Sequence, residues 1–322
     1  MKTIVISAAL LVTLGVTAGC AENNGTDAAA TLTSCGLPLT VAAPPQRALT
    51  LEQNATEILL TLGLADRMIG TSYQTDPVLP ELTAAYDSVP VLARLYPNRE
   101  AVLAAKPDFV YSTFTSGFAP DAAGPRADLQ TLGVPAYLSR FACEDPATGE
   151  TAAGFDGLLA EVTEIAGIFG VAGRGAEIVA DQRARLAATA GTGSADTDLL
   201  WYYSGTTTPY VAGRNGVPAA IGAHLGVRNA YGDATSAWPA GSWEEIAQRD
   251  PDVIVLADLT RGGDGDSAAS KMDFLRTNPV TRELAAVKAG RFITVSGSSM
   301  DPSIRSITAA EQVAAGLTEL TA

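Results

Sequence analysis

The sequence predicts an α/β fold in which two α/β lobes are joined by a long helical connector. Three observations lead to this prediction. Short β-rich runs alternate with helical patterns in both halves of the chain, the centre has helical periodicity alone, and one segment of the first half recurs in the second. Strand–helix alternation with short Gly and Pro punctuation favours parallel sheets covered by helices.

The first lobe is assigned to residues 37–150. Its expected strands cover residues 47–51, 68–71, 89–92, 109–112 and 136–138. Its expected helices cover residues 55–62, 99–105 and 127–132. The first and last of these helices end at Gly63 and Gly133, as helices often do at a glycine in the left-handed conformation.

The helical connector is assigned to residues 151–195. Apolar residues recur at helical spacing through two stretches of it, and no strand pattern fits there. The second lobe, residues 196–322, resumes the alternation. Its expected strands cover residues 199–203, 253–256 and 292–295, and its expected helices lie near residues 219–225 and through residue 317.

An internal repeat relates the two lobes. Residues 98–110 align without gaps with residues 242–254. Each segment begins with a residue that caps helices, places an acid two residues later, continues as a short helix and breaks at Pro-Asp before a strand. Glu100 and Glu244 therefore hold equivalent positions on the two lobes.

The N-terminus is typical of a targeting segment. Lys2 precedes an apolar run over residues 4–16, which is shorter than the about 20 residues that a membrane span needs. The run ends in Thr-Ala-Gly-Cys20, which resembles a bacterial lipobox. We therefore expect residues 1–19 to be a lipoprotein signal peptide, Cys20 to be lipidated and residues 20–36 to form a flexible tether. The alternative is an ordinary secretory signal followed by a chance cysteine.

Composition narrows the class of protein. The chain is 47% apolar and 17% charged, as in a globular protein, and its formal net charge is −14. Nucleic acid is therefore excluded as a partner, because phosphate binding needs a basic face, and self-repulsion favours a monomer. Enzymes are disfavoured, since the sequence has no Gly-x-Ser-x-Gly elbow, Walker A loop or His-Glu-x-x-His motif.

The small numbers of histidine and cysteine residues limit the metal-ion and cysteine chemistry that the chain can support. His224 is the only histidine, so a site for a bare transition-metal ion is not expected, and no resident cofactor is indicated. Cys35 and Cys143 remain beyond Cys20. Outside the cytoplasm such a pair favours a disulfide, although two free thiols are the alternative. A bridge closing a loop of about 110 residues would stabilise the fold by roughly 4–5 kcal/mol.

Several segments resemble one known family. The opening of the first lobe is similar to that of the iron-siderophore and cobalamin receptors of ABC importers, and a later segment also matches. These segments are Arg47-Ala-Leu-Thr-Leu51, Ala55-Thr-Glu-Ile-Leu59, Leu62-Gly-Leu64, Asp66-Arg-Met-Ile-Gly70 and Ala286-Val-Lys-Ala-Gly-Arg-Phe292. The resemblance runs in order over roughly residues 40–320.

The resemblance implies a class III solute-binding protein, with two Rossmann-like lobes bridged by a long helix and a ligand held between them. Together with the lipobox-like segment, it predicts a lipid-anchored location on the extracytoplasmic side of the cell membrane, and it implies an ABC permease dimer with its ATPase subunits as partner. It also implies that Glu100 and Glu244 dock onto arginines of the permease. Without the resemblance, each acid would merely complement its helix N-terminus.

Candidate ligand-binding residues lie in loops at strand ends, where open α/β sheets bind ligands. The aromatic candidates suit a bulky, partly apolar ligand, and the arginines suit a carboxylate, catecholate, hydroxamate complex or phosphate. The candidates are Asn54, Tyr73, Arg94, Tyr96, Phe114 and Arg140 on the first lobe, and Tyr203, Arg214, Trp238, Asp301 and Arg305 on the second.

The expected ligand is a ferric siderophore or cobalamin. Three segments also resemble a subgroup proposed to take up a deazaflavin cofactor precursor, so this ligand stays open. They are Tyr86-Asp-Ser-Val-Pro-Val-Leu92, Leu95-Tyr-Pro-Asn-Arg-Glu100 and Asp108-Phe-Val-Tyr-Ser112. A cell-surface adhesion module or a hydrolase are the alternatives from other classes.

Overall fold

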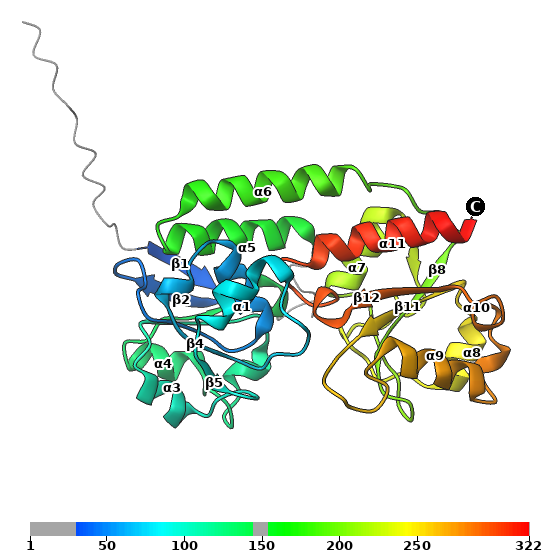
Figure 1. Cartoon of the computed structure of the whole chain (residues 1–322), viewed down its shortest axis with the longest axis horizontal. Helices are drawn as coiled ribbons and strands as arrows, with labels where there is room; N and C mark the ends of the chain where they lie inside the picture. Colours follow the sequence, from blue (N-terminus) through cyan, green and yellow to red (C-terminus); the bar gives the residue numbers. More distant parts are fainter. Residues whose placement is uncertain (1–29, 144–153, 322) are drawn as a thin grey trace, which may run out of the picture.

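The computed structural model describes residues 30–143 and 154–321, which form two α/β lobes lying side by side under a layer of helices (Figure 1). The expected signal peptide, Cys20 and the first part of the expected tether lie outside the described residues. Within the described ranges, no helix is both long and apolar enough to cross a membrane.

The N-terminal lobe contains a five-stranded parallel sheet in the order β5-β4-β3-β6-β7. The strands are β3 (Ala48–Thr50), β4 (Met68–Ser72), β5 (Val91–Ala93), β6 (Phe109–Ser112) and β7 (Ala136–Leu138). The chain moves outward from β3 to β5 and then returns to β6 on the other side of β3. Such a reversal opens a crevice at the carboxyl ends of the two central strands.

The helices of this lobe are α1 (Gln53–Thr61), α2 (Thr83–Asp87), α3 (Arg99–Ala105) and α4 (Arg126–Thr131). α1 begins two residues before the predicted start. Its first turn is buried and follows β3 directly, so the residues that start the helix also line the crevice.

The C-terminal lobe repeats this plan. Its parallel strands have the order β10-β8-β11-β12, and the short β9 pairs with β8 in the antiparallel direction. The strands are β8 (Asp198–Ser204), β9 (Tyr210–Val211), β10 (Arg228–Asn229), β11 (Val253–Asp258) and β12 (Phe292–Ser296). The helices are α7 (Val217–Leu225), α8 (Trp243–Arg249), α9 (Ala268–Thr277), α10 (Ala285–Lys288) and α11 (Ser306–Thr321).

The internal repeat seen in the sequence is also a structural repeat. Asn98 and Ser242 cap α3 and α8, each accepting a hydrogen bond from the N–H three residues later, at 2.9 and 3.1 Å. Both helices end in a left-handed residue, Lys106 with φ 52° and Asp250 with φ 40°. The same caps therefore close the same helix in each lobe.

The aspartates of the Pro-Asp pairs that follow these helices make equivalent hydrogen bonds in the two lobes. The Asp108 carboxylate accepts hydrogen bonds from the backbone N–H groups of Gln46 (2.8 Å) and Arg47 (2.9 Å), just before β3. Asp252 accepts one from the N–H of Asp198 (2.8 Å), where β8 begins. In each lobe the aspartate thus fixes the start of the neighbouring central strand.

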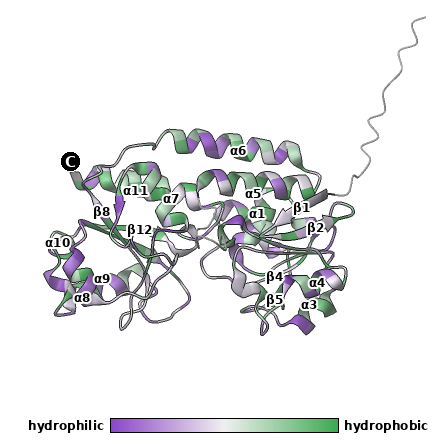
Figure 2. Ribbon diagram, turned by 180° about the vertical axis from the view of Figure 1, so that it is seen from behind, coloured by the Kyte–Doolittle hydropathy of each residue, from purple (hydrophilic) through white to green (hydrophobic). Residues whose placement is uncertain are grey.

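The connector consists of two helices, α5 (Phe155–Ile168) and α6 (Ala172–Ala187), which correspond to the two stretches of helical spacing in the sequence, whereas the family resemblance implied one long bridging helix. The chain reverses at Gly170, which has a φ of 69° that a glycine adopts without strain. Hydrophilic and hydrophobic residues alternate along α6 (Figure 2), since one of its faces packs on α5 and the other meets solvent.

Both connector helices contribute to both lobes. On α5, Leu158 packs in the core of the C-terminal lobe and Ile165 in that of the N-terminal lobe; on α6, Leu186 and Ile178 do the same. Because each helix is embedded in two cores, bending the connector would open apolar contacts on both sides. The two helices α5 and α6 therefore form a stiff connection between the lobes.

The expected tether over residues 20–36 is corrected at its C-terminal end. β1 (Ala30–Ser34) and β2 (Leu37–Val41) form an antiparallel hairpin. Its two-residue turn, Cys35 and Gly36, has positive φ at both positions, as a type I′ turn requires. Leu39 is fully buried in the lobe core, so apolar burial fixes this segment to the lobe.

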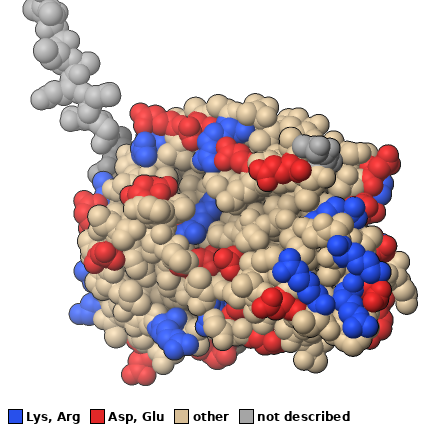
Figure 3. All heavy atoms as spheres, turned by 45° about the vertical axis from the view of Figure 1, so that its right-hand side comes forward, with Lys and Arg blue, Asp and Glu red and all other residues tan. Residues whose placement is uncertain are grey.

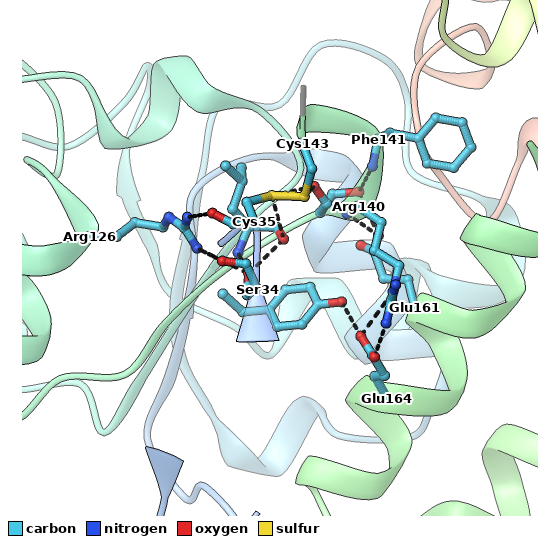
Figure 4. Close-up of a disulfide and its surroundings, with 11 residues drawn as sticks. Ser34, Cys35, Arg126, Arg140, Phe141, Cys143, Glu161 and Glu164 are labelled. Atoms are coloured by element: carbon cyan, nitrogen blue, oxygen red, sulfur yellow. Dashed lines mark hydrogen bonds and ion pairs between the residues drawn. A yellow bond between two sulfur atoms is a disulfide. The ribbon is translucent and has the colours of Figure 1, made fainter. Parts of the chain in front are cut away.

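A disulfide joins Cys35 in the hairpin turn to Cys143 beyond β7, with an S–S distance of 1.94 Å (Figure 4). Next to it, the Ser34 hydroxyl donates to the carbonyl of Leu138 (2.9 Å), and the Arg126 guanidinium donates to the carbonyl of Ser34 (2.9 Å). The hairpin is therefore attached to the lobe by a covalent bond as well as by polar contacts.

Replacing both Cys35 and Cys143 by serine should lower the free energy of unfolding by about 4–5 kcal/mol, because the bridge closes a loop across a separation of 108 residues. Guanidinium unfolding followed by circular dichroism measures this. Reducing the unmodified protein before unfolding should give the same loss. An unchanged midpoint in both experiments would contradict the stabilising role.

The cleft between the lobes as candidate functional site

A cleft of about 370 Å³ lies between the lobes and is lined by residues of both. Its walls are built mainly from the carboxyl ends of the strands and the loops that follow them. The lining residues are Glu52, Gln53, Asn54, Tyr73, Thr75, Tyr96, Phe114, Ser116, Tyr203, Trp238, Arg261 and Asp301.

Two of the N-terminal lobe's central strands supply one wall. Glu52 and Asn54 come directly after β3, at the start of α1, and Phe114 follows β6. These two strands flank the reversal of the sheet, so the cleft lies where the topology of an open α/β sheet predicts a ligand crevice.

Each lobe adds a pair of aromatic rings. Tyr73 and Tyr96 lie edge to face with 4.7 Å between ring centroids, and Tyr203 and Trp238 lie tilted with 4.6 Å between theirs. Tyr73 has a φ of 46°, an uncommon conformation for a bulky residue, and such strain persists where surrounding contacts fix it. The hydroxyl of Ser116 also donates to the hydroxyl of Tyr96 at 3.0 Å.

A buried carboxyl from each lobe also lines the cleft. Glu52 accepts hydrogen bonds from the N–H of Thr113 and the hydroxyl of Ser112, both at 2.7 Å. Burial raises the pKa of Glu52 to about 7 despite these bonds. Burial likewise raises the pKa of Asp301 to about 7, against the opposing hydrogen bond from the Tyr203 hydroxyl (3.0 Å).

The cationic side chain on this lining is Arg261, in the loop after β11. Its guanidinium forms an ion pair with Asp266 at 2.7 Å and lies over the ring of Tyr203, 5.6 Å from the centroid. The positive charge of Arg261 is therefore partly compensated before any ligand enters.

Of the eleven predicted ligand-binding residues, seven lie together on this cleft: Asn54, Tyr73, Tyr96, Phe114, Tyr203, Trp238 and Asp301. Their contact with a ligand stays a prediction. Four arginines, Arg94, Arg140, Arg214 and Arg305, do not line the cleft, which corrects their selection as ligand-binding candidates.

The positions of the arginines explain this correction. Arg305 is buried and donates to the Glu57 carboxylate, with Nε 2.6 Å from Oε2. Arg140 forms an ion pair with Glu164 on α5, beside the disulfide (Figure 4). Arg94 and Arg214 are exposed to solvent.

Sequence reasoning missed Glu52, Gln53, Thr75, Ser116 and Arg261. The first two adjoin Asn54 at the end of β3, so the rule that selected Asn54 could have found them. Arg261 precedes the glycine-rich segment 262–266, which contains no recognisable binding motif. Thr75 and Ser116 carry no distinctive signal in the sequence.

No group of three or more His, Cys, Asp or Glu side chains that could hold a metal ion occurs in residues 30–143 and 154–321. His224 lies on α7, away from the cleft. Its Nε2 is 3.0 Å from the Thr189 hydroxyl and 2.9 Å from the carbonyl of Leu186. These contacts give the histidine a structural role between α7 and the end of α6.

Two Rossmann-like lobes, a helical connector and a cleft between the lobes define a class III solute-binding fold. The chain belongs to the periplasmic binding protein family, whose profile matches residues 49–298, and the family resemblance in the sequence is thereby confirmed. Members of this family are binding proteins rather than enzymes, and membership implies an extracytoplasmic location.

Individual proteins that are similar to this chain are consistent with this family. The "Vitamin B12-binding protein" of Vibrio campbellii (strain ATCC BAA-1116) is 25% identical over 235 residues, covering 71% of this chain and 77% of the relative. A solved periplasmic binding protein from Veillonella parvula is 28% identical with a TM-score of 0.79, covering 91% of this chain and 98% of its own. An "ABC-type Fe3+-hydroxamate transport system" structure from Saccharomonospora viridis has a TM-score of 0.73 at 22% identity, with coverage of 91% and 98%.

The raised pKa of Glu52 predicts a pH-dependent stability. The folded protein holds this proton up to about pH 7, whereas the unfolded chain releases it near 4.5. The stability that comes from the bound proton of Glu52 is therefore fully present below pH 4.5 and is lost as the pH rises through about 7. At about 1.4 kcal/mol per pKa unit, Glu52 should lower the free energy of unfolding by up to about 3 kcal/mol across this window.

Urea unfolding between about pH 5 and pH 8 checks this. Glu52→Gln keeps the acceptor for Thr113 and should flatten the fall in stability with pH. Glu319→Gln, an exposed acid on α11, is the control and should leave the slope unchanged. An identical slope in both variants would mean that the Glu52 carboxyl titrates normally.

Proposed function

We propose that this chain is the lipid-anchored receptor of an ABC importer, and that it binds a bulky chelate such as a ferric siderophore or cobalamin between its lobes. The aromatic cleft carries this proposal. Five aromatic rings from two lobes offer a large contact area with little rotamer entropy to lose, which suits a large, partly apolar ligand. The cleft volume of about 370 Å³ falls within the usual range of small-molecule sites.

The names of similar proteins support the same ligand classes. One relative is named as a vitamin B12-binding protein, and one solved relative is described as part of an Fe3+-hydroxamate transport system. The ligand would arrive as a preformed chelate, because the described residues hold no cluster of side chains for a bare metal ion.

The deazaflavin precursor ranks second as a ligand. The tyrosines would stack on its aromatic rings equally well, but it carries an anionic phosphodiester. Arg261 is the cation on the cleft lining and is already paired with Asp266, so an anionic group would find little compensation there. A hydrolase has less support, because the lone histidine is remote from the cleft. An adhesion module also has less support, because it would not need a cleft lined by aromatic side chains.

The lipid anchor is the second part of the proposal. Cys20 would become the first mature residue, and a short linker would connect it to the hairpin that starts at residue 30. Anchoring keeps the receptor close to its permease and so raises their effective concentration. The hairpin and its disulfide would then hold the point where the linker enters the N-terminal lobe.

Docking on the permease is the third part. Glu100 and Glu244 are exposed in the first turns of α3 and α8, the helices that the repeat relates. Both helices lie on the side of the lobes away from α6 (Figure 1). Two acids in equivalent places on one side would engage two symmetric basic pockets of a permease dimer. On the face shown in Figure 3, which is a different side of the molecule, acidic and basic side chains are interspersed.

Ligand binding is testable by spectroscopy. Protein purified from its native host should show the absorption bands of a ferric chelate or a corrinoid. Adding such a chelate to ligand-free protein should raise the melting temperature and quench the fluorescence of Trp238, which lines the cleft. A deazaflavin spectrum would favour the second ligand, and a protein unaffected by all three classes would refute the receptor function.

Matched variants localise the effect. Trp238→Ala should weaken chelate binding by about tenfold or more, as truncation of a central aromatic contact commonly does. Tyr210→Ala removes an exposed aromatic side chain outside the cleft and should leave the affinity unchanged. Equal effects of the two variants would place the ligand elsewhere.

The docking role predicts a loss of transport without a loss of binding. The double variant Glu100→Lys and Glu244→Lys should abolish uptake in proteoliposomes that contain the permease, because two attractive contacts become repulsive. Asp181→Lys with Glu319→Lys changes the net charge equally at exposed sites on α6 and α11 and should transport normally. Normal uptake by the first double variant would show that docking does not use these acids.

A further inference from the structure

Two buried carboxyls in the cleft lack a counter-ion. Glu52 is 2% exposed and Asp301 is 5% exposed, and neither forms an ion pair with any residue of the described ranges. Glu52 receives only neutral donors, from Ser112 and Thr113. A buried carboxylate without a cation is unfavourable, which is why such groups are normally paired or hold a proton.

Another buried acid of this protein shows the contrast. Glu57, which is fully buried, is paired with Arg305, whose guanidinium donates to both of its oxygens. The fold supplies a cation to this carboxylate, whereas Glu161, a buried acid on α5, accepts only from the hydroxyls of Tyr111 and Ser139 and the N–H of Arg140. Glu52 and Asp301 differ from both of these acids because they line the cleft, where a ligand can reach them.

The cations at or near the cleft already have partners. Arg261 lines the cleft and pairs with Asp266, whose side chain is 4% exposed, and its charge opposes only in part the burial that raises the pKa of Asp301. Lys271 is fully buried, donates to the carbonyls of Ala257 (2.6 Å) and Asp266, and does not line the cleft. The negative charge of a further acid, Asp76, adds to the rise in the pKa of Asp301 that burial causes. The cleft is therefore short of positive charge.

The aromatic rings reinforce this polarity. Tyr96 lies close to both carboxyls: burial, and then the charges of Glu52 and Asp301, raise its pKa. The faces of tyrosine and tryptophan rings attract cations. With Tyr73, Tyr203 and Trp238 around the same space, the site combines an aromatic box with two acids. An ammonium group or a cationic metal centre satisfies both elements at once.

We propose that the cleft selects chelates by charge, preferring a ligand that brings a positive group to Glu52 and Asp301 and rejecting strongly anionic ones. This inference rests on the proposed receptor function. Hydroxamate groups are monoanionic and neutralise ferric ion, so their complexes are neutral, or cationic when they also carry an amine. Catecholates are dianionic and leave a strongly negative complex, which would meet two acids. A cationic corrinoid fits for the same reason as an ammonium-bearing hydroxamate.

A chemically matched series of probes tests the charge preference. The first probe is the ferric complex of a linear tris-hydroxamate with a terminal primary amine. Acetylation of that amine makes the complex neutral, and succinylation makes it anionic, while the metal centre is unchanged. Titration calorimetry should show binding at least about tenfold tighter for the amine than for the succinylated complex, with the acetylated one between them.

Variants assign the preference to the two carboxyls. Glu52→Gln with Asp301→Asn should weaken binding of the ammonium probe by about tenfold or more and leave the acetylated probe nearly unaffected. Glu319→Gln is the matched control and should change neither. Cobalamin with water or cyanide as axial ligand gives a second cationic and neutral pair, for which the same variants should act only on the cation.

The outcomes separate the two proposals. Equal affinities across the series, or tighter binding of the succinylated or a catecholate complex, would overturn the charge preference and leave the receptor function standing. A uniform loss in the double variant for every probe would mean that the carboxyls act on the shape of the cleft and not on charge. Failure of every chelate to bind would overturn both proposals.

Discussion

The buried ion pair between Glu57 on α1 and Arg305 just before α11 is the contact on which the arrangement of the lobes depends. Arg305 also donates to the carbonyl of Pro77 at 2.7 Å, so one guanidinium holds two segments of the opposite lobe. Removing one member of a buried pair leaves an uncompensated charge and commonly costs about 3–5 kcal/mol. Because α1 begins at the cleft, a shift of this pair would also move the cleft wall.

A series of hydrogen bonds connects the Glu57–Arg305 ion pair to the cleft. Gln53 donates to Glu57 (3.0 Å) and accepts from the N–H groups of Thr75 (3.0 Å) and Asp76 (2.8 Å). From the other lobe, Thr260 donates to the carbonyl of Thr75 at 2.8 Å. The segment that bears Tyr73 is therefore fastened to both lobes. Together with the stiff connection formed by α5 and α6, this network favours a cleft that is largely formed before ligand enters. Such a preformed cleft reduces the entropic cost of binding.

The sequence predicted the parts of this molecule that depend on local order. Helix caps, Pro-Asp breaks and strand alternation are short-range signals, so the two lobes, the connector and the repeat around Glu100 and Glu244 were all predictable. The hairpin at residues 30–41 was not, because its polar alternation resembles a linker until Leu39 is seen to enter the core. The same limit applies to Arg305: the type of residue was plausible for a ligand site, but its partner Glu57 is distant in sequence.

The charge of the cleft shows most clearly why site chemistry needs the fold. Four arginines near strand ends were candidate ligand contacts, yet the fold directs Arg140 and Arg305 to acids outside the cleft and leaves Glu52 and Asp301 inside it. An acidic chain can thus contain many arginines and still present a cleft short of positive charge. Since a receptor is complete only with its cargo, the groups that the protein leaves uncompensated indicate what the ligand must supply. Here the uncompensated groups are negative, and the aromatic rings around them favour the same kind of ligand.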